Sequence, residues 1–507
     1  MRPHHIALGF AALTLTAHLL VAGRYEPHRD ELLYLALGRH LHWGYASVPP
    51  MIGWLGALAD ALWANPVWGA KLWAALGGAA VAVVVGAIVQ TLGGGRWATL
   101  AACAAVVFSP AYVATSALFQ PVIFDILLWT LSIWLFLRLL LSEDTRWWIP
   151  LGAVWGLGMM TKYNIAFLIA AAGLALLATP AKRLLFSRHL LWGALAGLAI
   201  WSPNLYWQYQ EGFPVIHHMR ELSRTQLVHV DALDFLLNQL LMNGHAAWFW
   251  LFALAAVWIY PGERRLRPLA VLFVAAIGLY LLGRGKAYYT LGLYPALMAA
   301  GAVMAERYWR RAYAWAALAF TVLLALPLAP IGLPVFSHDR MAGYFAALSG
   351  VIGTGFLTWE TGEVHPITQD YADMTGWQEM TDLVALAYSR LSDDEKRHCV
   401  VSAENYGQAS AIAILGRERG LPEPICFSDN YLYWLPDSLS FKALIRMNDE
   451  ESDVHDLFGR VELVGEVRNP WARERGLMVW ICRDPIPGFG AFYQNRLKTR
   501  RAERMPQ

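Results

Sequence analysis

The chain has 507 residues, of which 57% are hydrophobic and only 15% are charged, and its mean hydropathy is +0.38. A soluble globular protein carries about 25% charged residues, so this composition excludes an ordinary soluble enzyme and a disordered or fibrous protein. The formal net charge is +2 and no basic block is present, which argues against a nucleic-acid-binding protein. Four cysteines without a CxxC pair argue against a zinc ribbon or a thioredoxin-type site.

Charge divides the chain into two parts. Up to Leu333 it contains 22 Lys/Arg and 13 Asp/Glu, whereas the much shorter part from Pro334 contains 18 and 25. We therefore predict an α-helical polytopic membrane domain over residues 1–333 and a soluble α/β domain over residues 334–507. In the soluble domain we expect strands at 399–401, 461–467 and 477–482, helices at 373–391 and 409–415, and a disordered basic tail over 496–504.

Apolar runs predict about eleven transmembrane helices, because a helix needs about 20 mostly apolar residues to cross a bilayer. The candidate spans are 6–22, 67–90, 98–115, 120–141, 147–160, 164–179, 189–205, 240–260, 267–283, 287–304 and 312–331. The first run has no A-x-A cleavage site and is followed by further spans, which favours a retained helix over a signal peptide.

Basic loops set the expected orientation. With the N-terminus in the cytoplasm, three basic loop clusters fall inside, as the positive-inside rule requires. These clusters are Lys182, Arg183 and Arg188; Arg264, Arg265 and Arg267; and Arg307, Arg310 and Arg311. An odd number of spans then places residues 334–507 outside, in the periplasm if the membrane is the inner membrane of a Gram-negative bacterium.

The first outer loop, residues 23–66, is expected to carry the reaction centre. Asp30 stands at a predicted helix start, and the Pro49-Pro50 pair separates this helix from a second amphipathic one. Both helices are too short to span a bilayer and are expected to lie at its interface. A helix N-terminus favours an ionised carboxylate, so Asp30, followed by Glu31, is a candidate general base. The alternative is that both are ordinary loop acids.

Further ionisable residues are expected near the same face. Asp125 lies about one turn into the fourth span, Lys162 between the fifth and sixth, and Arg284 and Lys286 between the ninth and tenth. Charges at membrane depth are costly and often mark function. The alternative is that each side chain anchors a helix end at the interface.

A series of short motifs occurs in a characteristic order. The first loop contains Arg29-Asp30-Glu31-Leu32-Leu33-Tyr34, Gly38-Arg39-His40-Leu41, Trp43-Gly44-Tyr45 and Pro49-Pro50. The membrane part contains Phe119-Gln120-Pro121, Phe124-Asp125, Thr161-Lys162-Tyr163, Gly285-Lys286, Tyr288-Tyr289 and Leu293-Tyr294-Pro295-Ala296. The soluble part contains Asp370-Tyr371-Ala372-Asp373-Met374, Gly376-Trp377 and Asn405-Tyr406-Gly407. Over nearly its whole length the chain resembles bacterial family-39-type glycosyltransferases. These are GT-C membrane enzymes related to protein O-mannosyltransferases and to the aminoarabinose transferase of lipid A.

The resemblance implies transfer of a sugar from a polyprenyl-phosphate donor to an envelope lipid, glycan or protein, with inversion at the anomeric carbon. The family's acidic motifs map onto Asp30, Glu31 and Asp125, of which Asp30 would take the proton of the acceptor. Positive charge on Lys162, Arg284 and Lys286 would bind the donor phosphate. The three acids could also hold a divalent metal through their oxygens, and metal use stays open.

Two other classes stay open. A transporter or flippase of polyprenyl-linked lipids would have paired repeats, broken helices and charges near the midplane, and a non-catalytic scaffold would use the acids as helix caps. No repeat is evident and the charges lie toward one face, which favours an enzyme. The soluble part has no GxGxxG or P-loop, so a nucleotide site is not expected there. Outside the cytoplasm, disulfides among Cys399, Cys426 and Cys482 would be permitted.

Overall fold

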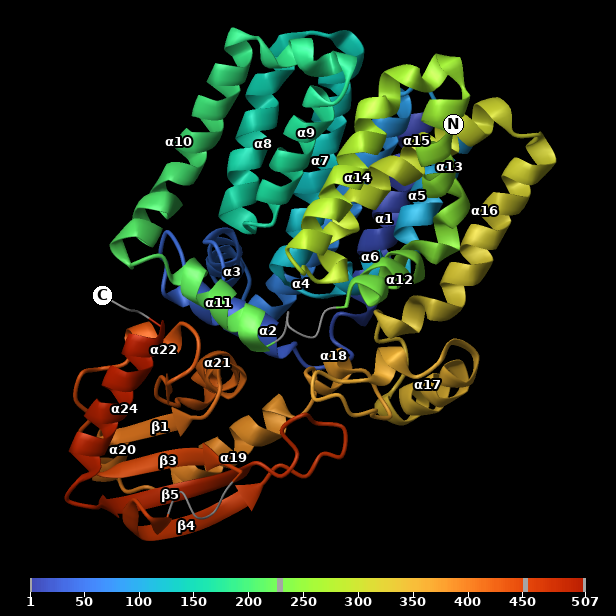
Figure 1. The fold of residues 1–507 in the computed structure, drawn as a ribbon. Coiled ribbons are helices and arrows are strands. Elements are labelled where there is room, and N and C mark those ends of the chain that lie inside the picture. Colours follow the sequence, from blue (N-terminus) through green and yellow to red (C-terminus); the bar gives the residue numbers. More distant parts are fainter. Residues whose placement is uncertain (1, 226–230, 450–454, 505–507) are drawn as a thin grey trace.

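The structure is a computed structural model that describes residues 2–225, 231–449 and 455–504. A bundle of helices forms one part of the molecule, and a sheet with its covering helices forms the other (Figure 1). The first loop of the chain, with helices α2 (Arg29–Arg39) and α3 (Met51–Leu62), lies at the end of the bundle that faces the sheet (Figure 1).

The helical part runs from the N-terminus to about residue 331. Its helices are α1 (Pro3–Val21), α2, α3, α4 (Pro66–Thr91), α5 (Arg96–Val107), α6 (Pro110–Ala117), α7 (Pro121–Ser142), α8 (Trp148–Thr161), α9 (Ile165–Leu177), α10 (Arg188–Gln210), α11 (Pro214–Thr225), α12 (Ala232–Asn243), α13 (Ala247–Ile259), α14 (Arg267–Leu282), α15 (Tyr294–Tyr308) and α16 (Arg311–Ala325). Proline stands in the first turn of α1, α4, α6 and α7, where its missing N–H costs nothing and its fixed φ favours the helix.

Within the described residues, six helical segments are long and apolar enough to cross a membrane. They are Pro3–Val21, Pro66–Thr91, Pro121–Ser142, Ala232–Ile259, Pro261–Leu282 and Arg311–Ile331. Helices α5 and α6, bent by 61° at a short break, would together make a seventh. The expected count of about eleven is therefore not confirmed, because helices such as α8, α9 and α15 have only 14, 13 and 15 residues.

Small residues allow α8 and α10 to pack closely. Gly152 and Gly156 on α8 face Gly193 and Gly197 on α10, and a Cβ on Gly152 would lie 2.0 Å from the carbonyl oxygen of Gly193. Two such small residues four positions apart are a common device for close packing of membrane helices. The pair explains why these apolar segments adopt helices that lie side by side in Figure 1.

The C-terminal part contains a mixed sheet in the order β2-β1-β3-β5-β4. Strand β1 pairs in parallel with β2 and β3, while β5 pairs antiparallel with β3 and β4. The strands are β1 (Cys399–Ala403), β2 (Ile425–Cys426), β3 (Ala443–Asn448), β4 (Phe458–Glu466) and β5 (Met478–Pro485). The helices are α17 (His338–Ile352), α18 (Gln369–Ala372), α19 (Trp377–Ser389), α20 (Asp393–Arg397), α21 (Tyr406–Leu415), α22 (Tyr431–Trp434) and α24 (Phe489–Arg504).

The prediction of an α/β domain is confirmed, with two differences in detail. Strands β2 and β3 were not predicted, and the expected disordered tail over 496–504 is wrong because this segment belongs to α24. Tyr493 and Leu497, one turn apart on this helix, are both buried against Leu432 and Leu435. The basic composition of this segment therefore did not indicate that the helix also has a buried apolar face. All four cysteines are free.

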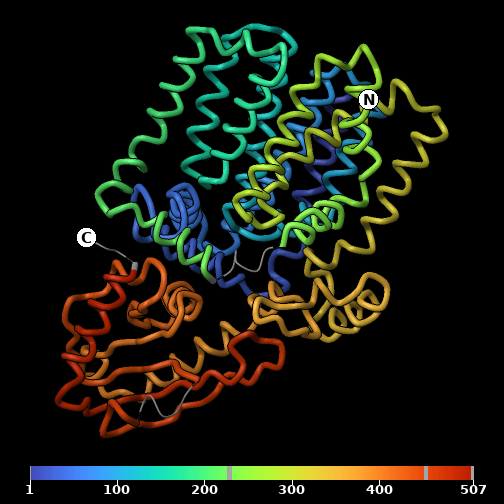
Figure 2. The backbone as a smooth tube through the Cα atoms, viewed as in Figure 1, coloured from blue at the N-terminus to red at the C-terminus, as the bar shows by residue number. Residues whose placement is uncertain are grey.

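The two parts share one continuous core. Buried apolar residues of α2, such as Leu32 and Leu37, belong to the same cluster as Trp377 on α19 and Ile412 on α21. The tube in Figure 2 shows the same relation, with the blue first loop lying against the orange segment of the C-terminal part. The predicted boundary at residue 334 is thus bridged by direct packing.

The N-terminus and the sheet lie at opposite ends of the bundle (Figure 1). The turns between α9 and α10, α13 and α14, and α15 and α16, which carry the three basic clusters, lie at the end distant from the sheet (Figure 1). The three basic loops and residues 334–507 thus lie at opposite ends of the bundle, as the loop charges predicted. The side of the membrane on which each end lies stays a prediction.

Candidate active site

The candidate site begins at the first turn of α2. The side chain of His28 accepts a hydrogen bond from the backbone N–H of Asp30 at 3.1 Å, and Glu31 accepts one from the backbone N–H of His28 at 2.8 Å. This reciprocal cap satisfies N–H groups that have no partner inside the helix. The sequence placed Asp30 at the helix start; His28 is the capping residue, and Asp30 lies inside the first turn.

Glu31 is fully occupied by contacts within the protein. One carboxylate oxygen accepts from Lys71 Nζ at 2.7 Å, and the other accepts from the backbone N–H of Phe119 at 2.7 Å. Glu31 is 1% exposed and Lys71, on α4, is 8% exposed. A buried ion pair is tolerated when hydrogen bonds satisfy its charges, and the Glu31 carboxylate accepts from Lys71 and from two backbone N–H groups. Glu31 therefore joins α2, α4 and the turn before α7.

Asp30 has the opposite environment, since 27% of its side chain is exposed. Oδ1 accepts a hydrogen bond from the Tyr406 hydroxyl at 2.8 Å, and Oδ2 accepts one from Gln120 Nε2 at 3.2 Å. The guanidinium of Arg29 lies 3.8 Å from Oδ1. Asp30 is thus oriented by three neighbours and is still accessible, as a group that exchanges a proton with a substrate must be.

The C-terminal part contributes directly to this turn. The backbone N–H of Arg29 donates to the carbonyl of Asp373 at 3.0 Å, and the Arg29 guanidinium lies 3.7 Å from the Asp373 carboxylate. Glu26 accepts from the backbone N–H of Trp377 at 2.6 Å. Burial raises the pKa of Asp373, although the charges of His28, Arg29 and Arg473 act in the opposite direction. The start of α2 is therefore held by residues distant in sequence.

Asp125 lies about one turn inside α7 and is 4% exposed. Its Oδ2 accepts from Asn164 Nδ2 at 2.7 Å, and the same amide donates to the carbonyl of Tyr289 at 3.0 Å. The hydroxyl of Tyr280 donates to the amide oxygen of Asn164. Among the described residues, Oδ1 of Asp125 has no hydrogen-bond partner although it is buried. A buried polar atom of this kind often marks a functional position.

Lys162, between α8 and α9, lies over two aromatic rings. Its Nζ is 4.4 Å from the ring centroid of Tyr289 and 5.1 Å from that of Tyr288, within the range of cation–π interaction. Lys162 also interacts electrostatically with Asp125 and Lys286. We call Asp125, Lys162, Asn164, Tyr289 and Lys286 the Lys162 cluster.

The structure brings together most of the predicted residues. Tyr288 joins the two sites, because it contacts Lys162 and lies within electrostatic range of Asp30. Arg284, in contrast, is exposed and makes no side-chain hydrogen bond or ion pair within the described residues. Within the described residues, no group of three or more His, Cys, Asp or Glu side chains is arranged to hold a metal ion. Among the described residues, Asp125 shares no direct hydrogen-bond partner with Asp30 or Glu31.

Sequence reasoning missed Lys71 and Asn164. Lys71 is a single charge near the start of a long apolar segment, and the argument that charges at membrane depth mark function would have found it. Asn164 is uncharged and follows Lys162 by two residues, so no sequence signal distinguished it. Gln120 and Tyr406 belong to the motifs but were given no function.

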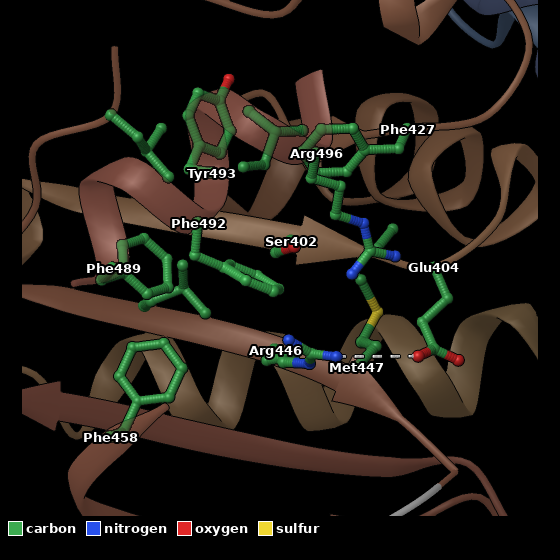
Figure 3. Close-up of a pocket in the computed structure, with 14 residues that line it drawn as sticks. Ser402, Glu404, Phe427, Arg446, Met447, Phe458, Phe489, Phe492, Tyr493 and Arg496 are labelled. Carbon is green, nitrogen blue, oxygen red and sulfur yellow. Dashed lines mark ion pairs between the residues drawn. The ribbon is translucent and has the colours of Figure 1, made fainter. Parts of the chain in front are cut away.

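A separate small cavity lies within the C-terminal part (Figure 3). It has a volume of about 50 Å³ and lies between β1, β3 and the aromatic residues of α24. Arg446 lies 4.0 Å from Glu404 beside it. None of the predicted site residues lines this cavity, so it is distinct from the site at α2.

A model of the dolichyl-phosphate-mannose-protein mannosyltransferase family matches residues 47–207. Among curated proteins, the lipid A galacturonosyltransferase RgtD of Rhizobium johnstonii is 24% identical over 203 residues. That alignment covers 38% of this chain and 41% of the relative, so it spans less than half of the relative's length.

Solved structures extend the likeness to almost the whole chain. ArnT from Cupriavidus metallidurans bound to undecaprenyl phosphate matches with a TM-score of 0.64 at 14% identity, and apo ArnT with 0.61 at 16%. Both matches cover 93% of this chain and 97% of that one. At such identities a match establishes the fold. Together these comparisons support the expected resemblance: the chain is similar to this mannosyltransferase family and to a lipid A galacturonosyltransferase, and it has the fold of ArnT.

Proposed function

We propose that the protein is an inverting glycosyltransferase that moves a sugar from a polyprenyl-phosphate donor to an envelope acceptor at the outer face of the bacterial inner membrane. One observation carries this proposal: an accessible, oriented carboxylate, Asp30, lies within electrostatic range of Tyr288, which contacts Lys162. A proton acceptor and a fixed positive charge are thus near each other at one end of the bundle. These are the two groups that the reaction requires.

The chemistry follows from the charges that develop. The acceptor hydroxyl attacks the anomeric carbon, a new carbon–oxygen bond forms, and the bond from that carbon to the phosphate oxygen breaks. Asp30 takes the hydroxyl proton as general base. The lipid phosphate leaves as an anion, which needs positive charge more than it needs a proton. Lys162 and Lys286 supply this positive charge.

The other two acids act through their neighbours. Glu31, which is buried and bound to Lys71, fixes the first turn of α2 and hence the direction of Asp30. Asp125 holds Asn164 and attracts Lys162, so it positions the positive charge. In this proposal the three acids do not form one metal site, and whether a divalent metal takes part is a matter for the assay.

The relatives support the substrate classes. The curated relative is described as acting on lipid A, and one solved ArnT structure contains undecaprenyl phosphate. We infer a polyprenyl phosphate of this kind as the donor carrier and a glycolipid as the favoured acceptor, with glycan and protein as alternatives. The three basic loops at the end distant from the sheet support a cytoplasmic position for that end, and hence an outer position for Asp30 and residues 334–507.

The charge distribution also favours an enzyme over a flippase. The bend between α5 and α6 is one broken helix of the kind that transporters contain. The charged groups described above, however, lie at helix ends beside the C-terminal part. Alternating access requires charges reachable from both sides, whereas a group-transfer site at one leaflet does not.

The test is a transfer assay with the purified protein in lipid nanodiscs, combined with lipid analysis of a deletion strain. We expect the strain to lose one envelope sugar and to accumulate one polyprenyl-phosphate sugar, and the purified protein to consume that donor. Asp30→Asn would serve as the inactive control. Movement of the intact donor across vesicles without sugar release would instead establish the flippase.

A further inference from the structure

A tyrosine of the C-terminal part contacts the candidate base. Tyr406 is the first residue of α21, and its hydroxyl lies 2.8 Å from Asp30 Oδ1, 376 positions away in sequence. The same hydroxyl oxygen lies 2.9 Å from Arg29 Nε and 2.5 Å from Nη2. Arginine can only donate hydrogen bonds. The tyrosine oxygen therefore accepts from Arg29, and its single hydrogen is directed to Asp30.

This direction has a consequence for the carboxylate. With Oδ1 bound by Tyr406 and close to Arg29, negative charge on that oxygen is shared with a donor chain of fixed orientation. Within the described residues, Oδ2 accepts one longer hydrogen bond, 3.2 Å from Gln120, and lies 4.0 Å from His28 Nδ1. Oδ2, which is held less tightly than Oδ1, is thus the oxygen more available for a substrate proton.

Packing fixes the position of the tyrosine. Asn405 caps α21 by accepting from the backbone N–H of Gln408 at 3.1 Å, which sets the first turn that carries Tyr406. A Cβ on Gly407 would lie 3.2 Å from Trp377 and 3.4 Å from Arg29, so glycine allows α21 to approach α2 this closely. Burial and the charge of Asp30 raise the pKa of Tyr406 well above its usual value, against the opposing effect of Arg29. The hydroxyl therefore stays a donor.

We propose that Tyr406 is a positioning residue for the transfer reaction: it holds Asp30 Oδ1 so that Oδ2 faces the acceptor hydroxyl. The C-terminal part then completes the active site and does more than cover it. This inference rests on the proposed function, specifically on Asp30 as the base, and extends it to a residue with no assigned function.

The test compares Tyr406→Phe with the wild-type protein. Loss of one hydrogen bond to a charged group should lower kcat about 10- to 100-fold, with little change in the KM for the donor, because Tyr406 has no contact with the Lys162 cluster among the described residues. Tyr431→Phe is the matched control: its hydroxyl is also buried in the C-terminal part and lies 3.2 Å from Ser410 Oγ. The control should retain wild-type kcat.

A double variant separates positioning from a general structural effect. If Tyr406 acts through Asp30, Tyr406→Phe should cause no further loss of kcat in the Asp30→Asn background, because the loss is shared. If the losses of kcat from the two single changes multiply in the double variant, the inference is overturned. A wild-type kcat for Tyr406→Phe would also overturn it. Both results would leave the proposed function intact. Near wild-type activity of Asp30→Asn alone would overturn both the base and the inference that depends on it.

Discussion

Two acidic sites at the same end of the bundle have contrasting surroundings. At the start of α2, Asp30 is 27% exposed and held by side chains from the turn before α7 and from the C-terminal part. In the Lys162 cluster, Asp125 is 4% exposed, accepts a hydrogen bond from Asn164 and interacts electrostatically with Lys162. Exposure together with several hydrogen-bond donors suits a group that must accept a proton, whereas burial beside a lysine suits a group that holds a charge in place. In the proposed function, this contrast corresponds to different steps at the two sites.

The difference in surroundings is larger still between two adjacent acids, Asp30 and Glu31. Asp30 and Glu31 are adjacent in one helical turn, yet both oxygens of Glu31 are occupied by Lys71, Phe119 and the cap of His28. An acidic pair in a motif need not be a catalytic pair. The predictions below test this division, from the largest expected effect to the smallest.

The largest effect is expected from Asp30→Asn. The amide can still accept from Tyr406, and Gln120 can rotate its own amide, so the fold should be retained while the proton acceptor is lost. Loss of a general base should lower kcat about 100- to 10,000-fold, measured as the initial rate with a polyprenyl-phosphate sugar.

Asp60→Asn is the matched control for Asp30→Asn. Asp60 lies on α3 in the same loop, is 28% exposed and is near Arg39 and Arg417 at 3.6 and 3.5 Å. Its change should leave kcat within about twofold, since a surface ion pair contributes about 1 kcal/mol or less. Equal losses in the two variants would mean that the loop responds to any loss of charge, and the base would then have to be sought elsewhere.

Glu31→Gln should act on stability. Both oxygens of Glu31 accept hydrogen bonds, so the amide nitrogen must face either Lys71 or the N–H of Phe119. Removal of one partner of a buried ion pair costs about 3–5 kcal/mol, measured as a lower unfolding temperature in detergent. The double variant Glu31→Gln with Lys71→Met should recover part of that loss. A fully stable Glu31→Gln protein without activity would make Glu31, rather than Asp30, the candidate general base.

Lys162→Met should weaken use of the donor. One charge-assisted contact to a phosphate is worth about 1.5–3 kcal/mol, or about 10- to 100-fold in apparent donor affinity or turnover. Lys396→Met is the control, because Lys396 also lies over a tyrosine, 5.9 Å from the ring centroid of Tyr388, but in the C-terminal part. If Lys396→Met lowers donor affinity or turnover as much as Lys162→Met does, the loss results from cation–π packing, and the phosphate site must be placed elsewhere.

Local patterns predicted much of this structure. The Pro49-Pro50 pair and the apolar spacing around it predicted two short helices in the first loop, and α2 and α3 are there. Hydrophobic composition predicted the bundle, and strands β1, β4 and β5 were found from their apolar residues. These features depend on residues within one segment, which is why the sequence shows them.

Contacts between distant segments could not be predicted in this way. Nothing near Asp30 in sequence indicates Tyr406, because this pair forms only when the bundle and the C-terminal part pack together. Nothing near Glu31 indicates Lys71 as its partner, because that pair forms only when α2 packs against α4. The expected span count is not confirmed, for a related reason. Length rules describe a helix that crosses lipid alone, whereas α8 and α9 lie against neighbouring helices and are shorter.

The smallest effect is expected at Arg284, which the sequence grouped with Lys162 and Lys286 as a phosphate ligand. It is exposed, has no side-chain partner within the described residues, and its backbone φ is +51°, a conformation that favours glycine. Arg284→Gly should therefore keep or raise the unfolding temperature and change apparent donor affinity by no more than about threefold, the scale of an exposed charge. A loss of affinity as large as that of Lys162→Met, in a protein of unchanged stability, would show that Arg284 turns toward the phosphate when donor binds. The positive site would then extend from the Lys162 cluster to the exposed turn after α14, and the division between a buried donor side and an accessible acceptor side would have to be redrawn.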